Sequence, residues 1–182
     1  KRAVRYKGAK LIVVDPRRTK MSQFARLWLK PRIGTDVALL NGLARVIITE
    51  GLLDEEFVAR RTDNFEAFLQ GLESYTPELV EETTGISSQE LLSAAQIFAT
   101  ADSASIVFGK GVTQQTNGTD AVKALANLAM VTGNTGHGSG GVFALQADSN
   151  GQGACDMGVL PTFLPGYQFE EDPRTLKKFT DC

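Results

Sequence analysis

The chain has 182 residues, of which 42% are hydrophobic, so it is long enough to bury a core of its own. Its formal net charge of −2 excludes the general basic field of a protein that binds nucleic acid, so any phosphate binding must be local. Apolar runs stay far below the roughly 20 residues that span a bilayer. This predicts a soluble, cytoplasmic protein without membrane insertion, and periplasmic export of a longer parent stays open.

The ends and the cysteines of the chain carry further information. Both ends lie in charged, helix-like stretches, which predicts an internal piece of a larger protein. Cys155 and Cys182 form no CxxC pair, so no zinc or iron–sulfur ligation is predicted within the chain. His137, the only histidine, lies in a glycine-rich loop where nothing beside it orients its ring, so it is not assigned as a catalytic base.

The first informative segment is an apolar run, residues 11–14, that ends abruptly in Asp15, Pro16, Arg17 and Arg18. A run without polar alternation is typical of a strand buried on both faces of a parallel sheet. Ligands of such sheets bind beyond the carboxyl ends of the strands. There an acid can accept from ribose or guanine, and guanidinium groups can bind phosphate. An ordinary strand followed by a solvated turn fits the same residues.

Helical patterns follow the first strand. Residues 31–36 lead into an amphipathic pattern at residues 36–50, with Thr35 or Asp36 as the expected N-cap. The free N–H groups of this helix start can bind an acceptor, and Asp36 can take the N1–H and N2–H of guanine together. Simple N-capping is the alternative. Short helices come next, at residues 54–60, 65–72 and 77–82, and behind a capping box of Ser87 and Glu90. We expect a helical insert, at about residues 52–100, with a small apolar surface of its own.

A second strand, residues 103–109, meets a glycine turn formed by Gly109, Lys110 and Gly111. The spacing matches neither a Walker loop nor a GxGxxG motif. We expect a tight turn that directs Lys110 and Gln114 toward the ligand, and exposed turn residues are the alternative. A helix at residues 119–131 follows. The order of strand, helices, strand and helix predicts an α/β fold with parallel pairing.

Residues 133–158 are rich in glycine, with residues 142–145 as the only strand-like piece. Such a length without regular structure is uncommon inside a compact domain unless it lines a ligand. Its apolar residues argue against a solvated linker, which is the alternative. We therefore predict a loop that lines a ligand.

Five segments, taken in order, resemble the prokaryotic molybdopterin oxidoreductases and most of all the formate dehydrogenase alpha (catalytic) subunit. They are residues 14–19 (VDPRRT), 31–40 (PRIGTDVALL), 109–114 (GKGVTQ), 128–134 (LAMVTGN) and 152–158 (QGACDMG). Each segment is weak evidence by itself, but their order is specific to the family. The resemblance implies a Rossmann-like parallel sheet with flanking helices and the helical insert.

The resemblance also implies a set of cofactor-binding residues. Residues 1–135 would bind a molybdopterin guanine dinucleotide, and residues 136–182 would line the cofactor and begin the following domain. The guanosine end would be held by Val14, Asp15, Pro16, Arg17, Arg18, Gly34, Thr35 and Asp36. The pyrophosphate or pterin would lie nearer to Gly109, Lys110, Gly111 and Gln114.

The parent implied by the resemblance holds molybdenum or tungsten between two such cofactors, oxidises formate to CO2, and passes electrons to iron–sulfur or other acceptor subunits. In the family pattern the metal ligand, its histidine and the cysteines of a 4Fe–4S cluster lie upstream. No catalytic or metal-binding residue is therefore assigned here, Cys155 included. The chain alone is expected to be inactive.

Gln146 departs from the pattern, because formate dehydrogenases have an arginine in that region. A cation would orient a carboxylate substrate, which a neutral amide cannot do. The alternatives are a molybdopterin oxidoreductase with another substrate, or a cofactor-less large subunit of an NADH:quinone-type complex that serves structure and electron transfer. An ordinary nicotinamide-binding domain is disfavoured, since no GxGxxG motif accompanies the first strand.

Overall fold

The computed structural model describes residues 2–136, 140–146, 149–160 and 162–180. The chain divides into two compact units, Lys1–Leu145 and Gln146–Cys182. Helices and short strands alternate along the chain, so the predicted α/β class is confirmed at this level. None of the described helices is long and apolar enough to cross a membrane. His137 and Cys182 lie outside the described residues.

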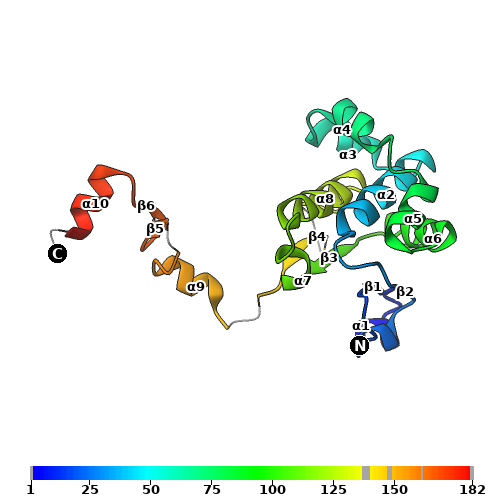
Figure 1. The fold of residues 1–182 in the computed structure, drawn as a ribbon, viewed down its shortest axis with the longest axis horizontal. Coiled ribbons are helices and arrows are strands. Elements are labelled where there is room, and N and C mark those ends of the chain that lie inside the picture. Colours follow the sequence, from blue (N-terminus) through cyan, green and yellow to red (C-terminus); the bar gives the residue numbers. More distant parts are fainter. Residues whose placement is uncertain (1, 137–139, 147–148, 161, 181–182) are drawn as a thin grey trace. The chain divides into compact units, whose positions relative to one another are not determined.

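The first unit contains two pairs of strands and most of the helices (Figure 1). Its strands are β1 (Ile12–Val14), β2 (Leu27–Leu29), β3 (Ser105–Phe108) and β4 (Gly141–Ala144). Its helices are α1 (Arg2–Tyr6), the 3-10 helix η1 (Ser22–Phe24), α2 (Asp36–Thr49), α3 (Glu55–Arg61), α4 (Phe65–Leu72), α5 (Pro77–Thr84), α6 (Ser88–Ala99), α7 (Lys110–Thr113) and α8 (Gly118–Val131). Within this unit, α3 and α4 lie at one end, and α1, β1 and β2 lie at the other (Figure 1).

The strands of the first unit form two parallel pairs. β1 pairs with β2, with Ile12 opposite Leu27, and β3 pairs with β4, with Ile106 opposite Val142. Parallel pairing was predicted and is confirmed. Each described sheet has two strands, so the larger Rossmann-like sheet stays a prediction.

β1 is more exposed than its composition predicts. Val14 is 44% exposed, and Ile12 and Val13 are half-buried. The prediction of a strand buried on both faces is therefore wrong for the described structure. The physical reason is that β2 is the single strand bonded to β1 among the described residues, and Ile12 is the β1 residue that packs on the core.

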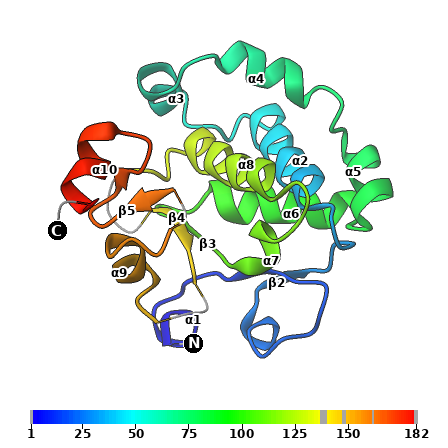
Figure 2. The same cartoon turned by 60° about the vertical axis from the view of Figure 1, so that its left-hand side comes forward.

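A hydrophobic core joins α2, α4, α5, α6 and α8 of the first unit. α2 packs against α6 and α8, which lie beside it in Figure 2, and also against α5. Leu39 and Ile47 of α2 are buried in this core, as is the β2 residue Leu29. The insert helices contribute to the same core through Val80 of α5 and Leu91 of α6. Burying each such side chain stabilises the fold by roughly 1.5–3 kcal/mol.

The helix starts follow the predicted capping residues in the insert. Asp54 accepts the Phe57 N–H at 2.8 Å and caps α3. Thr76 caps α5, with proline at its first position. Ser87 and Glu90 form both hydrogen bonds of the capping box of α6. These local signals were correct because each cap depends on residues within one helical turn.

Other helix ends depend on contacts that no local motif marks. The fully buried Thr84 hydroxyl donates to the Val80 carbonyl at 2.7 Å and accepts the Ile86 N–H at 3.0 Å. At the end of α8, Gly133 adopts φ +65° and lies so close to the Asp54 side chain that a Cβ would collide with it. The Thr84 contacts thus fix the end of α5, and the contact between Gly133 and Asp54 fixes the beginning of α3 against the end of α8.

The second unit contains α9 (Gly151–Asp156), β5 (Phe163–Leu164), β6 (Gln168–Phe169) and α10 (Pro173–Thr180), with β5 antiparallel to β6. α9 corrects the prediction that residues 133–158 lack regular structure outside the strand. Its N-cap is Asn150, which adopts φ 55° and accepts the Gly153 N–H at 3.2 Å. Asparagine adopts the left-handed backbone conformation more readily than most residues, and its side chain can cap a helix. The glycine-rich composition concealed this helix start.

Candidate nucleotide-binding site

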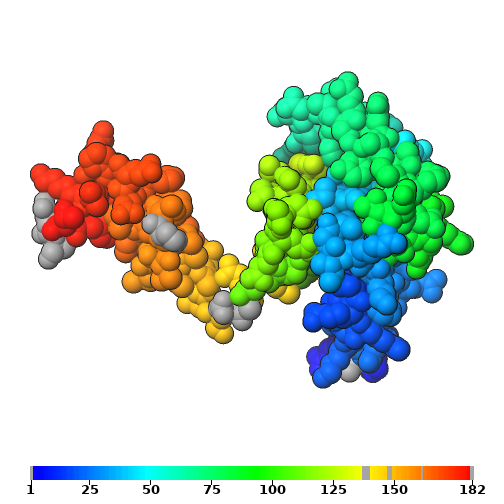
Figure 3. Space-filling view, viewed as in Figure 1, coloured from blue at the N-terminus to red at the C-terminus, as the bar shows by residue number. Residues whose placement is uncertain are grey.

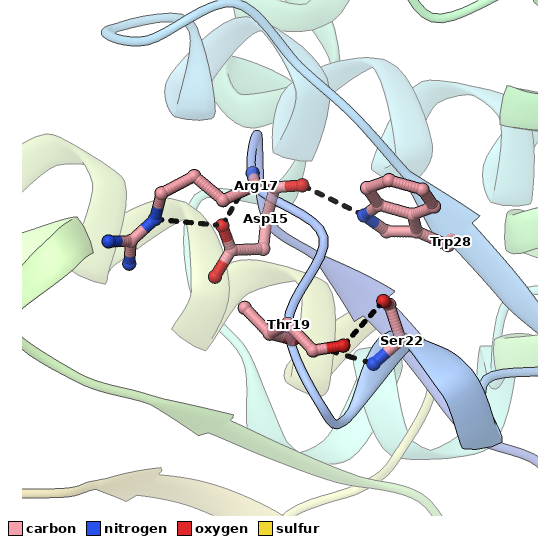
Figure 4. A network of polar contacts seen from close by, with 5 residues as sticks. All are labelled: Asp15, Arg17, Thr19, Ser22 and Trp28. Carbon is pink, nitrogen blue, oxygen red and sulfur yellow. Dashed lines mark hydrogen bonds and ion pairs between the residues drawn. The ribbon is translucent and has the colours of Figure 1, made fainter.

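The loop after β1 is ordered around Asp15 (Figure 4). The Asp15 carboxylate accepts the Arg17 backbone N–H at 2.8 Å and lies 3.6 Å from the Arg17 Nε. The Asp15 carbonyl accepts the Trp28 indole N–H at 2.9 Å, which ties the loop to β2. Further along, the Ser22 hydroxyl donates to the Thr19 carbonyl at 2.8 Å. Local turn contacts and one contact to β2 thus position Asp15.

Arg17 and Arg18 are exposed beside this acid. The Arg17 side chain is 85% exposed, so its ion pair with Asp15 is weak in water and leaves the guanidinium accessible. Pro16 is half-buried between them and the strand. A phosphate group could therefore be bound by these cations without displacing a buried partner.

The segment around β1 and β2, residues 2–32, forms a basic lobe. Residues 1–32 hold eleven of the chain's 19 Lys and Arg residues and a single acid, Asp15. All ten of the described cations in the lobe are exposed. In the space-filling view the lobe projects from the helical part of its unit (Figure 3). The net charge of the whole chain concealed this local cationic surface, which a running charge count would have found.

The start of α2 lies at the predicted N-cap residue, Thr35. Thr35 occupies the N-cap position, but its hydroxyl donates to the Arg32 carbonyl at 2.7 Å and accepts no helix N–H. The predicted N-cap position of Thr35 is therefore confirmed, and its side chain bonds back to the preceding loop. Gly34 adopts φ +88°, which turns the chain into the helix. Asp36 is the first helical residue and is half-buried, where the helix dipole favours its negative charge.

The glycine segment after β3 forms a helical turn instead of the predicted tight turn. Gly109 is the N-cap of α7, a single turn that contains Lys110 and Gly111. Gln114 ends that turn, with its N–H donating to the Lys110 carbonyl at 2.9 Å, and its side chain is exposed. The segment is helical because the N–H groups of residues 112 and 114 turn back onto carbonyls at its start.

Gln115 joins two of the predicted segments. Its Nε2 donates to the Asp36 carboxylate at 2.8 Å and to the Gly111 carbonyl at 2.8 Å. The start of α2 and the α7 turn are therefore neighbours, whereas the contacts of Asp15 lie in its own loop and on β2. Sequence reasoning missed Gln115, because its partner Asp36 is 79 positions away and only the fold brings them together.

The second unit has one small polar cluster. Gln152 donates to Asp156 and to the Tyr167 hydroxyl, both at 3.0 Å. Desolvation by neighbouring atoms raises the pKa of Tyr167, and the hydrogen bond from Gln152 acts against this increase. Cys155 is a free, half-buried thiol. Among the described residues no three His, Cys, Asp or Glu side chains gather as metal ligands would.

The fold and these contacts define a mixed α/β protein with polar side chains beyond the ends of its strands: Asp15 after β1, and Gln115 with Asp36 beyond β3. The molybdopterin oxidoreductase family model matches residues 1–180, so the chain belongs to that family. The resemblance found in the sequence is thereby confirmed.

Named relatives agree with this family. Formate dehydrogenase H of Escherichia coli (strain K12) is 46% identical over 172 residues, which are 94% of this chain and 24% of that protein. A formate dehydrogenase subunit alpha of Methanocaldococcus jannaschii is 48% identical over 166 residues, 91% of this chain and 25% of that protein. The solved structure of acetylene hydratase from Pelobacter acetylenicus matches with a TM-score of 0.68 and 41% identity, covering 70% of this chain and 18% of that chain. The chain thus spans about a quarter of the length of these two formate dehydrogenases.

Proposed function

We propose that the chain binds a molybdopterin guanine dinucleotide and is the cofactor-binding part of a formate dehydrogenase-like oxidoreductase. The observation that carries this proposal is the contact of Gln115 with both Asp36 and Gly111. It puts a carboxylate suited to guanine beside the turn expected near the pyrophosphate or pterin. Family membership supplies the identity of the ligand.

The residues fit the chemistry of this cofactor. The half-buried Asp36 carboxylate can accept the N1–H and N2–H of guanine, which form a pair of neighbouring donors. A Cβ built on Gly111 would meet nothing within 4 Å, so the turn leaves open space beside it. Arg17, Arg18 and Lys110 are exposed cations that suit phosphate oxygens. Val14, Pro16, Gly34, Thr35 and Gly109 would shape the backbone around these groups.

The activity we propose belongs to the longer parent. When bound, the molybdenum or tungsten centre exchanges electrons with the substrate. This chain's part is to bind and orient the cofactor, with a Rossmann-like sheet completed by other segments of the parent and with residues 136–182 lining the cofactor. A 4Fe–4S cluster, acceptor subunits and a cytoplasmic location complete the proposal. The relatives that support it include a formate dehydrogenase named as an alpha subunit.

A second substrate class is favoured by Gln146. This residue is exposed and neutral where the resemblance expects an arginine, and it therefore lacks the charge that would orient a carboxylate. Similarity to a protein named as an acetylene hydratase, a name that gives a substrate other than formate, agrees with this alternative. In this case the cofactor proposal stands and formate is not the substrate.

Metal and pterin analysis of the full-length parent, purified without oxygen from a host with the metal-insertion machinery, tests the cofactor. We expect molybdenum or tungsten with pterin fluorescence and about two guanine nucleotides per metal after acid hydrolysis. A parent free of metal and pterin would refute the proposal and favour the cofactor-less subunit. Formate-dependent reduction of an artificial acceptor then separates the two substrate classes, with the metal-free parent as control.

A further inference from the structure

We propose that Gln115 is a positioning residue that holds the Asp36 carboxylate in the orientation that selects guanine. This inference rests on the function proposed above. Gln115 lies outside every motif that carries the family resemblance, and its side chain is half-buried between the start of α2 and the α7 turn.

The orientation of the Gln115 amide is determined by its surroundings. The amide nitrogen uses its two hydrogens, one toward Asp36 and one toward the Gly111 carbonyl, each at 2.8 Å. The amide oxygen faces Gly34, where a Cβ would lie 3.6 Å from it. A flipped amide would put its oxygen against a carboxylate and a carbonyl. The amide oxygen, the carboxylate and the carbonyl would then face one another with no hydrogen to share, so the flipped state is strongly disfavoured.

Fixing the carboxylate has a consequence for recognition. Gln115 donates to Oδ2 of Asp36, and each carboxylate oxygen can accept more than one hydrogen bond. The second oxygen and the remaining lone pairs can therefore meet the two neighbouring donors of guanine. Adenine offers an acceptor at its ring N1 and cannot form the same pair. A carboxylate left to rotate would lose this geometry, while general attraction for phosphate would remain.

A rival interpretation makes the opposite prediction. The Gln115 amide donates to Asp36 as guanine would, so it could occupy the place of the base and have to leave before binding. Removing it would then strengthen binding. The two interpretations are separated by the sign of the change in affinity.

The test is a titration of the cofactor-free, full-length subunit with GDP and with ADP by calorimetry. Gln115→Ala removes the amide, and Gln115→Met keeps the length and neutrality of the side chain without either donor hydrogen. We expect each to weaken GDP binding about 10-fold, the effect of one hydrogen bond to a charged group, and to leave ADP binding unchanged. Gln89→Ala, at an exposed glutamine of α6, is the matched control and should change neither affinity.

A double-mutant cycle with Asp36→Asn shows whether Gln115 acts through Asp36. We expect Gln115→Ala to change GDP affinity less than about 2-fold in the Asp36→Asn background, because the carboxylate that it orients toward guanine is gone. Tighter or unchanged GDP binding by Gln115→Ala, an equal loss for GDP and ADP, or fully multiplicative effects would overturn the inference. If the unaltered subunit does not prefer GDP, or Asp36→Asn binds GDP normally, the guanine site itself is refuted and the role of Gln115 with it.

Discussion

Gly42 provides a test of the packing between α2 and α5. It is buried in the middle of α2, where a Cβ would lie 2.6 Å from Cγ2 and 3.1 Å from Cγ1 of Val80. Carbon atoms in van der Waals contact lie about 3.5–4.0 Å apart, so α2 and Val80 would have to separate by about 1 Å. Val80 is fully buried, and its branched side chain has one favoured rotamer in a helix, so it cannot turn away.

Two opposing effects set the magnitude for Gly42→Ala. Overpacking costs about 1–3 kcal/mol, and alanine gains about 1 kcal/mol of helix propensity over glycine. We expect a net loss of up to about 2 kcal/mol in the unaltered background. In the Val80→Ala background the space is open, so the same substitution should stabilise by up to about 1 kcal/mol.

The assay is urea unfolding of the 182-residue chain, followed by far-UV circular dichroism and by the fluorescence of Trp28, its only tryptophan. The free energy of unfolding is compared in the four chains of the double-mutant cycle. A coupling free energy above about 1 kcal/mol is expected for this direct contact. Stabilisation by Gly42→Ala in both backgrounds, or an equal loss in both, would refute the packing argument.

Three further predictions concern helix ends. Thr84→Val should lose about 1–3 kcal/mol, because it leaves a buried amide without its acceptor; an unfolding midpoint in urea equal to that of the unaltered chain would contradict this. Gly133→Ala should lose about 1–3 kcal/mol through its positive φ and its contact with the α3 cap, and a melting temperature within 1 °C of the original, about the measurement error, would count against it. Hydrogen bonds from the backbone N–H and hydroxyl of Ser88 lower the pKa of Glu81 from 4.5. The stability that this carboxylate contributes is therefore fully present above that value and is lost as the pH falls through the lowered pKa. Replacing Glu81 with Gln should flatten the acid limb of stability against pH, and an unchanged limb would exclude the role.

Local signals predicted α2 and the helices of the insert well, but they missed the helical turn α7 and the helix α9. The cap at Asp54 and the capping box at Ser87 each depend on residues within one turn, and the amphipathic pattern of α2 reflects the face it buries. Strand surroundings were predicted less well. An apolar run such as β1 indicates what a strand can bury, and its actual cover depends on segments distant in sequence.

The candidate site illustrates the same division. Motifs identified Asp36 and the glycines after β3 as separate groups, and the fold makes them neighbours through Gln115. A glutamine has no pattern of its own, because its role is defined by what lies 79 positions away. Thr35 occupies the predicted N-cap position, but its hydroxyl donates to the Arg32 carbonyl, a partner that the capping pattern does not indicate.

The arrangement of charge and geometry suggests how binding and selection are divided in the proposed site. The cations of the basic lobe are exposed and numerous, so they suit attraction of phosphates, and this attraction should weaken with salt. Asp36 is half-buried and accepts from an amide whose two N–H groups are both hydrogen-bonded, so it suits discrimination between bases. This discrimination should respond little to salt. Substitutions in the lobe should therefore lower the affinity for GDP and ADP together, whereas substitutions at the α2 start should change the ratio between them. That separation follows from the burial and the hydrogen bonds of each group, and it does not depend on where in the parent the redox chemistry takes place.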